Sequence, residues 1–181
     1  MIGHGFDTFR LQVDNKFCEK IIEENDSLDV ENATIESKND KRRSSKVSWV
    51  PLENNPKALQ QLIGEANKLY KFSLQEFEQL QYTRYEKDDH YDWHVDTHSK
   101  PYSNGMIRKL SFTILLNDEF EGGNFDIWNG HPISEKSEVK SYALKKGEMI
   151  VFPSHTWHRV NKVTSGVRKA LVGWLVGKQW I

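Results

Sequence analysis

From Leu74 onward the chain divides into short segments with the apolar and polar alternation of β-strands. Glycine-containing turns separate several of these segments, most clearly at 121–123 and 146–148. The expected strands cover residues 77–85, 91–95, 109–116, 124–128, 139–144, 149–152, 157–160 and 169–176. About eight short strands with such turns favour a jelly roll, also called a double-stranded β-helix, in which facing sheets bury one face of each strand.

The residues before this run of strands predict helices that support it. Asp14 has the position of an N-cap for a helix over 15–24. Apolar residues at helical spacing predict a second helix over 56–70. Short strands are expected over 6–13 and 47–50, and the second of them stops at a proline.

The segment 25–46 is polar and charged, which favours a solvent-exposed loop. At 181 residues the chain is expected to form a single domain, mainly β with N-terminal helices (α+β). Within one domain over 1–181, we therefore expect residues 1–73 to support a jelly-roll core at 74–181.

The charge balance and the single cysteine argue against several classes of protein. Lys and Arg total 25 against 26 Asp and Glu, so a nucleic-acid partner bound through bulk positive charge is not expected. Cys18 alone forms neither an internal disulfide nor a thiolate zinc cluster. No apolar run approaches ~18 residues, so no membrane partner is expected and the cytoplasm is the default compartment.

The tripeptide His94-Val95-Asp96 has the spacing of two metal ligands on one face of a strand, because side chains at i and i+2 point the same way. A histidine from another strand would complete the ligand set of a mononuclear non-haem Fe(II) centre. Both His155 and His158 are candidates for this third ligand. His158 is favoured because it opens an expected strand, whereas His155 follows Pro153 in a turn.

Arg168 lies ten residues past His158 and is the second part of the hypothesis. Its guanidinium could hold the far carboxylate of an organic acid whose near end chelates the metal, since arginine pairs with carboxylates in a bidentate geometry. Three ligands on one face of a metal, together with this arginine, indicate an oxygenase that consumes 2-oxoglutarate to hydroxylate another molecule.

In order and spacing, these motifs resemble those of the Fe(II)/2-oxoglutarate-dependent dioxygenases, specifically the prolyl 4-hydroxylase-like family. The resemblance covers most of the chain, from Arg43 to Trp174. The matching positions are Arg43-Ser44-Ser45 with Trp49, Tyr85, His94-Val95-Asp96, Leu110 to Asn117, Phe120 to Gly123, Gly147 to Ser154, His158-Arg159-Val160 and Gly166 to Leu171.

The resemblance implies roles for single residues. His94, Asp96 and His158 match the iron ligands of the family, and Arg168 matches the basic residue that pairs with the distal carboxylate of 2-oxoglutarate. These four residues are the expected catalytic set. Tyr85 matches a tyrosine that forms a hydrogen bond near the cosubstrate.

At the cosubstrate end, the sequence departs from the oxygen-sensing members of the family. Leu115 stands where those members place a tyrosine against the distal carboxylate, and Thr113, on the same strand face, is the expected replacement. Trp174 shares a strand face with Arg168 and matches a tryptophan beside the target proline. We expect it to contribute to both the cosubstrate site and the substrate site.

The family implies Fe(II), 2-oxoglutarate and dioxygen, with ascorbate as reductant. It also implies hydroxylation of a prolyl residue in a peptide or protein partner, with release of succinate and carbon dioxide. Arg108 matches a substrate-side arginine, and with Trp49, Tyr91 and Trp174 it would line a groove for an extended, proline-containing chain. The connection 97–107 could close over a substrate or be an ordinary loop.

Two alternatives stay open at this point. The same chemistry could act on another amino acid, a nucleobase or a small metabolite. A cupin-like module could instead bind a metal without catalysis, although such a module has no need for Arg168.

Overall fold

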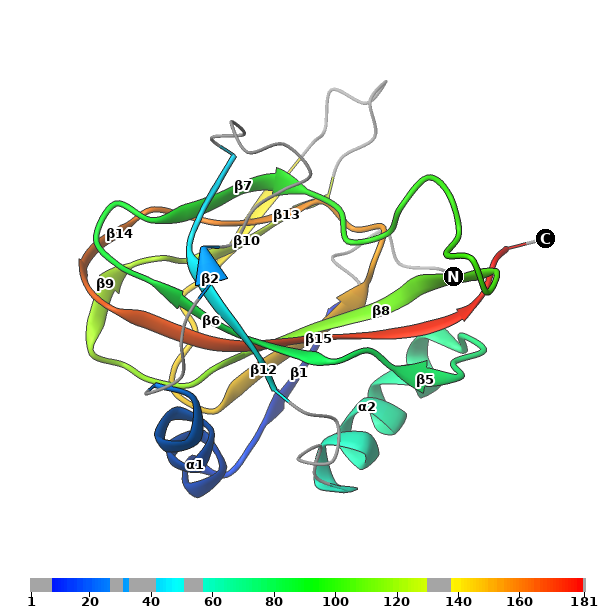
Figure 1. Cartoon of the computed structure of the whole chain (residues 1–181), viewed down its shortest axis with the longest axis horizontal. Helices are drawn as coiled ribbons and strands as arrows, with labels where there is room; N and C mark the ends of the chain where they lie inside the picture. Colours follow the sequence, from blue (N-terminus) through cyan, green and yellow to red (C-terminus); the bar gives the residue numbers. More distant parts are fainter. Residues whose placement is uncertain (1–7, 27–30, 33–41, 51–56, 130–137, 181) are drawn as a thin grey trace.

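The computed structural model describes residues 8–26, 31–32, 42–50, 57–129 and 138–180 (Figure 1). Most of these residues belong to strands, and two helices lie in the N-terminal part. The predicted class, a mainly β chain with N-terminal helices, is confirmed.

The two helices are α1 (Asn15–Asn25) and α2 (Lys57–Tyr70). The carboxylate of Asp14 accepts a hydrogen bond of 3.0 Å from the backbone N–H of Lys16, which confirms the predicted N-cap. The predicted first residue of the second helix lies outside the described residues. In the described part of the chain, no helix is long and apolar enough to cross a membrane.

The larger sheet has eight strands, and α1 and α2 cover its outer face (Figure 1). Its strand β15 pairs with β8 on one side and with β6 on the other. In spatial order the sheet contains β1 (Phe9–Gln12), β12 (Glu148–Pro153), β8 (Met106–Leu115), β15 (Arg168–Lys178), β6 (Leu80–Tyr85), β4 (Lys46–Val50) and β2 (Glu31–Asn32), with β5 (Glu76–Phe77) paired to β15.

The smaller sheet has five strands and lies across the larger one on the side away from the helices (Figure 1). In spatial order it contains β11 (Glu138–Tyr142), β10 (Phe125–Asn129), β13 (His158–Val160), β7 (His90–His94) and β3 (Arg43–Ser44). A separate antiparallel pair is formed by β9 (Phe120–Gly122) and β14 (Val163–Gly166).

Two apolar cores lie on opposite faces of the larger sheet. Helix residues such as Ile21 and Ile63 pack with Phe112 and Leu171 in the first core. The second core lies between the sheets and includes Phe125, Phe152 and Val160. Side chains alternate between the two faces of a strand, so one strand can serve both cores.

The eight strands expected from the alternation all occur, with shifted ends, but three expectations were wrong in detail. The segment 25–46 is not entirely a loop, because β2 and β3 lie in it, although much of it falls outside the described residues. The pair β9 and β14 was not expected, since these short polar segments have no clear alternation. The strand that carries His94 ends at that residue, so Asp96 lies beyond it.

Close packing at the centre of the larger sheet generates a prediction. A Cβ on Gly173 would come within 2.3 Å of Phe112 Cζ and 2.6 Å of Leu80 Cδ2. Gly173→Ala is therefore expected to lower the free energy of unfolding by about 1–3 kcal/mol.

The control is Gly64→Ala, which adds a methyl group in α2 where no atom lies within 4 Å. This variant should raise the free energy of unfolding by about 0.5–1 kcal/mol. Urea unfolding measures both; a Gly173→Ala protein as stable as the wild type would contradict the packing.

Candidate metal centre and adjoining cavity

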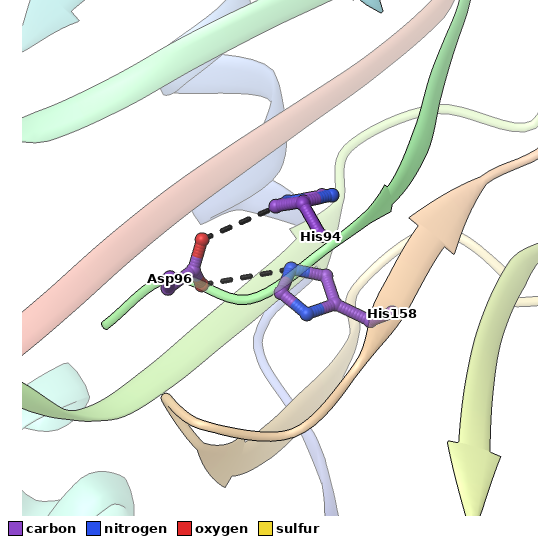
Figure 2. A group of neighbouring side chains, drawn as sticks. All are labelled: His94, Asp96 and His158. Carbon is purple, nitrogen blue, oxygen red and sulfur yellow. Dashed lines mark ion pairs between the residues drawn. The ribbon is translucent and has the colours of Figure 1, made fainter. Parts of the chain in front are cut away.

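Three side chains converge at one end of the space between the sheets. The imidazoles of His94 and His158 are neighbours that face the carboxylate of Asp96, each toward one of its oxygens (Figure 2). His94 Nε2 lies 3.7 Å from Asp96 Oδ1, and His158 Nε2 lies 3.6 Å from Asp96 Oδ2. One potential ligand atom from each residue lies within 4.8 Å of the others. This spacing allows one metal ion to contact all three ligand atoms.

Strand pairing accounts for the convergence. His94 and His158 are direct partners in the antiparallel pair β7 and β13. Asp96 follows the end of β7, and its backbone N–H donates a 2.8 Å hydrogen bond to the carbonyl of Ser154. Thr97 donates to the same carbonyl at 3.1 Å. The carboxylate is therefore placed by backbone contacts to the end of β12, not by strand alternation alone.

Both imidazoles present Nε2 to the centre. Nδ1 of His94 lies 2.8 Å from the carbonyl of Asp92, and Nδ1 of His158 lies 2.9 Å from the carbonyl of Thr156. A carbonyl only accepts, so in each neutral ring Nδ1 carries the proton. Nε2 then keeps its lone pair, and the hydrogen bond orients the ring as in many histidine metal ligands.

Burial and neighbouring groups favour the ligand forms of His94 and Asp96. Burial, followed by the charge of His158, lowers the pKa of His94 to about 3, so its imidazole is neutral at physiological pH. Burial raises the pKa of Asp96, but the neighbouring side chains of His158, His94 and Arg108 outweigh it and hold this pKa below its usual value. Asp96 Oδ2 is buried and has no hydrogen-bond partner among the described residues.

A cavity of about 310 Å³ opens from this centre between the two sheets. Every residue assigned a role from the sequence lies on its wall. These residues are His94, Asp96, His158, Arg168, Tyr85, Thr113, Trp174, Arg108, Trp49 and Tyr91.

Arg168 is a buried cation without an anionic partner in the part of the chain that the structure describes. Its side chain lies on the cavity wall, the residue is only 2% exposed, and no ion pair among the described residues includes it. Its Nε is buried and has no hydrogen-bond partner in the same part of the chain. Burial lowers the pKa of Arg168 because desolvation disfavours the charged form. An isolated buried guanidinium is costly, so its position favours an anionic ligand.

Three neighbours hold Arg168 in place. The side chain of Asn117 donates to the carbonyl of Val167 at 2.9 Å and accepts from the backbone N–H of Lys169 at 2.8 Å, so it brackets Arg168 from both sides. Tyr85 is its direct cross-strand partner, with the ring centroid 5.6 Å from Arg168 Cζ. A Cβ on Gly123 would lie 2.8 Å from Arg168 Cδ, so this glycine makes room for the stem. The sequence motifs contain these residues, but their contacts with Arg168 come from the structure.

The structure also shows where Leu115 lies, the residue at the position where the oxygen-sensing members have a tyrosine. Leu115 is buried on the same strand face as Thr113, and Thr113 lies on the wall of the cavity. Leu115 instead lines a second hollow of about 340 Å³, which shares Arg168 with the main cavity. This placement leaves Thr113 as a candidate hydroxyl at the cosubstrate end.

Arg108 and Trp174, both expected from the sequence to contact the substrate, form one packed unit. Arg108 binds the carboxylate of Glu78 through Nε and Nη2, with contacts of 2.6 to 3.0 Å. The guanidinium lies over the ring of Trp174, 3.8 Å from its centroid. Tyr102, in the connection 97–107, donates to the same Glu78 carboxylate at 2.9 Å.

Sequence analysis did not assign Arg43 a role, yet Arg43 lies on the cavity wall. Its strand β3 pairs with β7, which places Arg43 opposite Tyr91. The only sign of a role in the sequence was that Arg43 belongs to a motif that matches the family. That motif lies in the segment 25–46, which was otherwise interpreted as a loop. His155 is exposed and is not among the converging ligands, so the structure places His158 in the centre instead.

The family profile supports the same chemistry. The sequence profile described as the 2OG-Fe(II) oxygenase superfamily matches residues 80–176, which include all three converging ligands and Arg168.

A curated relative shares part of this region. The PKHD-type hydroxylase of Synechococcus sp. (strain CC9311) is 42% identical over 92 residues, which are 50% of this chain and 38% of that protein. The chain therefore spans about two fifths of the length of the curated relatives that match it in this way.

Solved structures share the fold across nearly the whole chain. A prolyl-4-hydroxylase of Pseudomonas putida superposes with a TM-score of 0.73 at 16% identity, covering 97% of this chain and 94% of the other. A prolyl hydroxylase from Trichoplax adhaerens, in complex with a hypoxia inducible factor peptide fragment, gives a TM-score of 0.73 at 15% identity, covering 94% and 83%. At these identities the likeness is one of fold, and the predicted double-stranded β-helix is confirmed.

The two candidate histidines generate a prediction about metal binding. His158→Ala should weaken Mn(II) binding by more than about a hundredfold, because even partners of metal ligands contribute about 10- to 100-fold. His155→Ala is the matched control and should bind Mn(II) as the wild type does. Isothermal titration calorimetry measures both; equal losses in the two variants would remove His158 from the ligand set.

The isolated charge of Arg168 generates a second prediction. Arg168→Met replaces an uncompensated buried cation with an apolar side chain, so the melting temperature without ligands should stay the same or rise. With Mn(II) present, 2-oxoglutarate should raise the melting temperature of the wild type but not of this variant. A variant that is unstable without ligands, or one that still responds to 2-oxoglutarate, would contradict the ligand role of Arg168.

Proposed function

The chain belongs to the 2OG-Fe(II) oxygenase superfamily, and from this premise we propose that it hydroxylates a prolyl residue in a peptide or protein. The reaction uses Fe(II), 2-oxoglutarate and dioxygen, and it releases succinate and carbon dioxide. One observation carries the proposal: three converging metal ligands and an isolated buried arginine line the same cavity.

The residues fit the metal that the family implies. Two imidazole nitrogens and one carboxylate form the donor set of non-haem Fe(II) oxygenases, which leaves the remaining metal positions for other ligands. Asp96 Oδ2 is buried and finds no hydrogen-bond partner within the described segments, and an ion held with His94 and His158 would satisfy it.

Arg168 fits one carboxylate of the cosubstrate. A carboxylate accepts two parallel hydrogen bonds from a guanidinium, which sets orientation as well as charge. Tyr85 and Thr113 line the same cavity and offer hydroxyl groups near the bound acid. Because Asn117 bonds to the backbone on both sides of Arg168, the backbone that carries this guanidinium is held in place before the acid arrives, which lowers the cost of binding.

When bound, Fe(II) and 2-oxoglutarate supply the oxidising power for inserting one oxygen atom of dioxygen into a C–H bond. The chain contributes position and exclusion of water. Phe125 and Phe152 pack against the ring of His158, at centroid distances of 5.5 and 4.7 Å, and keep one wall apolar. Such a wall limits side reactions of the oxidant with water.

The substrate side suits an extended chain that contains proline. Trp49, Tyr91 and Trp174 line the cavity, and Trp49 is 42% exposed at its mouth. Aromatic walls of this kind bind proline-rich segments, whose preformed conformation loses little entropy on binding. The named relatives and neighbours, PKHD-type and prolyl hydroxylases, support the same substrate class.

The proposal is tested with a panel of proline-containing peptides, Fe(II), 2-oxoglutarate and ascorbate, which is the proposed reductant. Mass spectrometry should detect the gain of one oxygen atom on proline, with an equivalent amount of succinate. Asp96→Ala is the matched control and should reduce both products by more than about a hundredfold.

The outcomes separate the proposal from its alternatives. Succinate without peptide oxidation would retain the oxygenase chemistry but reject the prolyl substrate, in favour of another amino acid, a nucleobase or a small metabolite. No succinate from a metal-loaded protein, with or without peptide, would favour a non-catalytic metal-binding module.

A further inference from the structure

Arg43 is a half-buried cation on the cavity wall that forms no ion pair among the described residues. Its Nε donates to the hydroxyl of Ser45 at 2.9 Å, and its Nη2 donates to the side-chain carbonyl of Gln81 at 2.9 Å. Both partners are neutral. A guanidinium carries five N–H donors, so these two bonds leave donors available for a ligand.

The other charges around the cavity have partners. Arg108 is paired with Glu78. A ferrous ion, Asp96, the dianion of 2-oxoglutarate and Arg168 would together be electrically neutral. Asp96 is the only acidic residue among the described residues that line the cavity. The positive charge of Arg43 would therefore remain uncompensated in the fully loaded site.

Arg43 also lies close to the reacting centre. Its Cζ is 4.6 Å from the ring centroid of Tyr91, and that ring stacks on His94 with centroids 3.5 Å apart. One aromatic ring, that of Tyr91, therefore lies between Arg43 and His94, a proposed metal ligand. Gln81, which accepts from Arg43, and Trp49 at the mouth line the same cavity. A group bound by Arg43 would lie beside the path of a substrate entering the cavity.

We propose, on the basis of the proposed function, that Arg43 binds a carboxylate of the substrate and makes the enzyme selective for prolyl residues with a carboxylate nearby. The geometry fits a bidentate or single charge-assisted contact from the free guanidinium donors. In a partly buried site such a contact gives about a tenfold to hundredfold gain in affinity. A neutral substrate would leave the charge of Arg43 without a counter-charge.

The carboxylate has two chemical sources. It can belong to an aspartate or glutamate side chain near the proline, or it can be the terminal carboxylate of a chain that ends at or next to the proline. Three kinds of peptide around one proline distinguish them. The first is neutral with both ends blocked, the second adds one aspartate at each flanking position in turn, and the third is neutral with a free C-terminal carboxylate beside the proline.

Binding is measured by calorimetry on protein loaded with Mn(II) and 2-oxoglutarate without dioxygen, so that affinity is separated from turnover. One or both carboxylate peptides should bind at least about tenfold more tightly than the neutral peptide. In Arg43→Gln this preference should disappear, and in Arg43→Lys part of it should return. Arg10→Gln is the matched control. Arg10 lies on β1 of the larger sheet, where it is paired with Glu148, and this variant should keep the full preference.

The same peptides are then assayed for oxygen gain and succinate. Equal affinity of all three peptides for the wild type, or a preference that survives Arg43→Gln, overturns the role of Arg43. A preference that depends on Arg43 without oxidation of any peptide supports the carboxylate site and rejects the prolyl hydroxylase proposal. Oxidation of the neutral and acidic peptides with equal efficiency supports the prolyl activity and rejects the selectivity.

Discussion

The antiparallel pairing of β7 with β13 is the contact on which the metal centre depends. It places His94 directly opposite His158, although the two residues are 64 positions apart in the sequence. The pair is irregular, because the partners of His158 and Val160 are His94 and Tyr91. This bulge adds one residue to β7, so Tyr91 and His94 face the same cavity instead of opposite sides. The stacking of Tyr91 on His94 follows from the same irregularity. Arg43 comes to lie opposite Tyr91 through a second pairing, that of β3 with β7.

A second constraint is the cost of charge inside the protein. Arg168 is buried on the cavity wall, and none of the acidic residues that the structure describes pairs with it. Such an arrangement persists only if the surrounding structure stabilises it or a ligand compensates it. Asn117 and Gly123 provide the first condition by bracketing the backbone and leaving room for the stem. An acid that enters the cavity would meet the second condition, because its carboxylate would compensate the charge of Arg168. Arg108 shows the contrasting case, since Glu78 neutralises it and leaves its guanidinium free to pack on Trp174.

The cavity therefore has two ends with different electrostatic character. At the inner end, the metal ligands and Arg168 form a set of charges that a metal ion and a dicarboxylic acid would balance. At the mouth, Trp49 provides apolar surface and Arg43 provides a charge held only by neutral groups. If a metal ion and the cosubstrate take up the inner groups as proposed, the residues at the mouth are left to contact the substrate. Differences in selectivity between related chains should accordingly arise there.

Sequence alone was enough for the strand-rich class and for the helix cap at Asp14, because these depend on residue type and on spacing along one chain segment. It also singled out His94, Asp96, His158 and Arg168 as candidates, and the structure brings these four side chains to one cavity. Alternation could not reveal where β7 ends, the bulge that turns Tyr91 toward His94, or the strand that brings Arg43 to the cavity. It also could not show that Arg108 has an acidic partner whereas Arg168 and Arg43 have none among the described residues. Those features arise from contacts between residues distant in the sequence. Only the tertiary structure decides them, since burial and pairing of charges are properties of the space between elements and not of any single element.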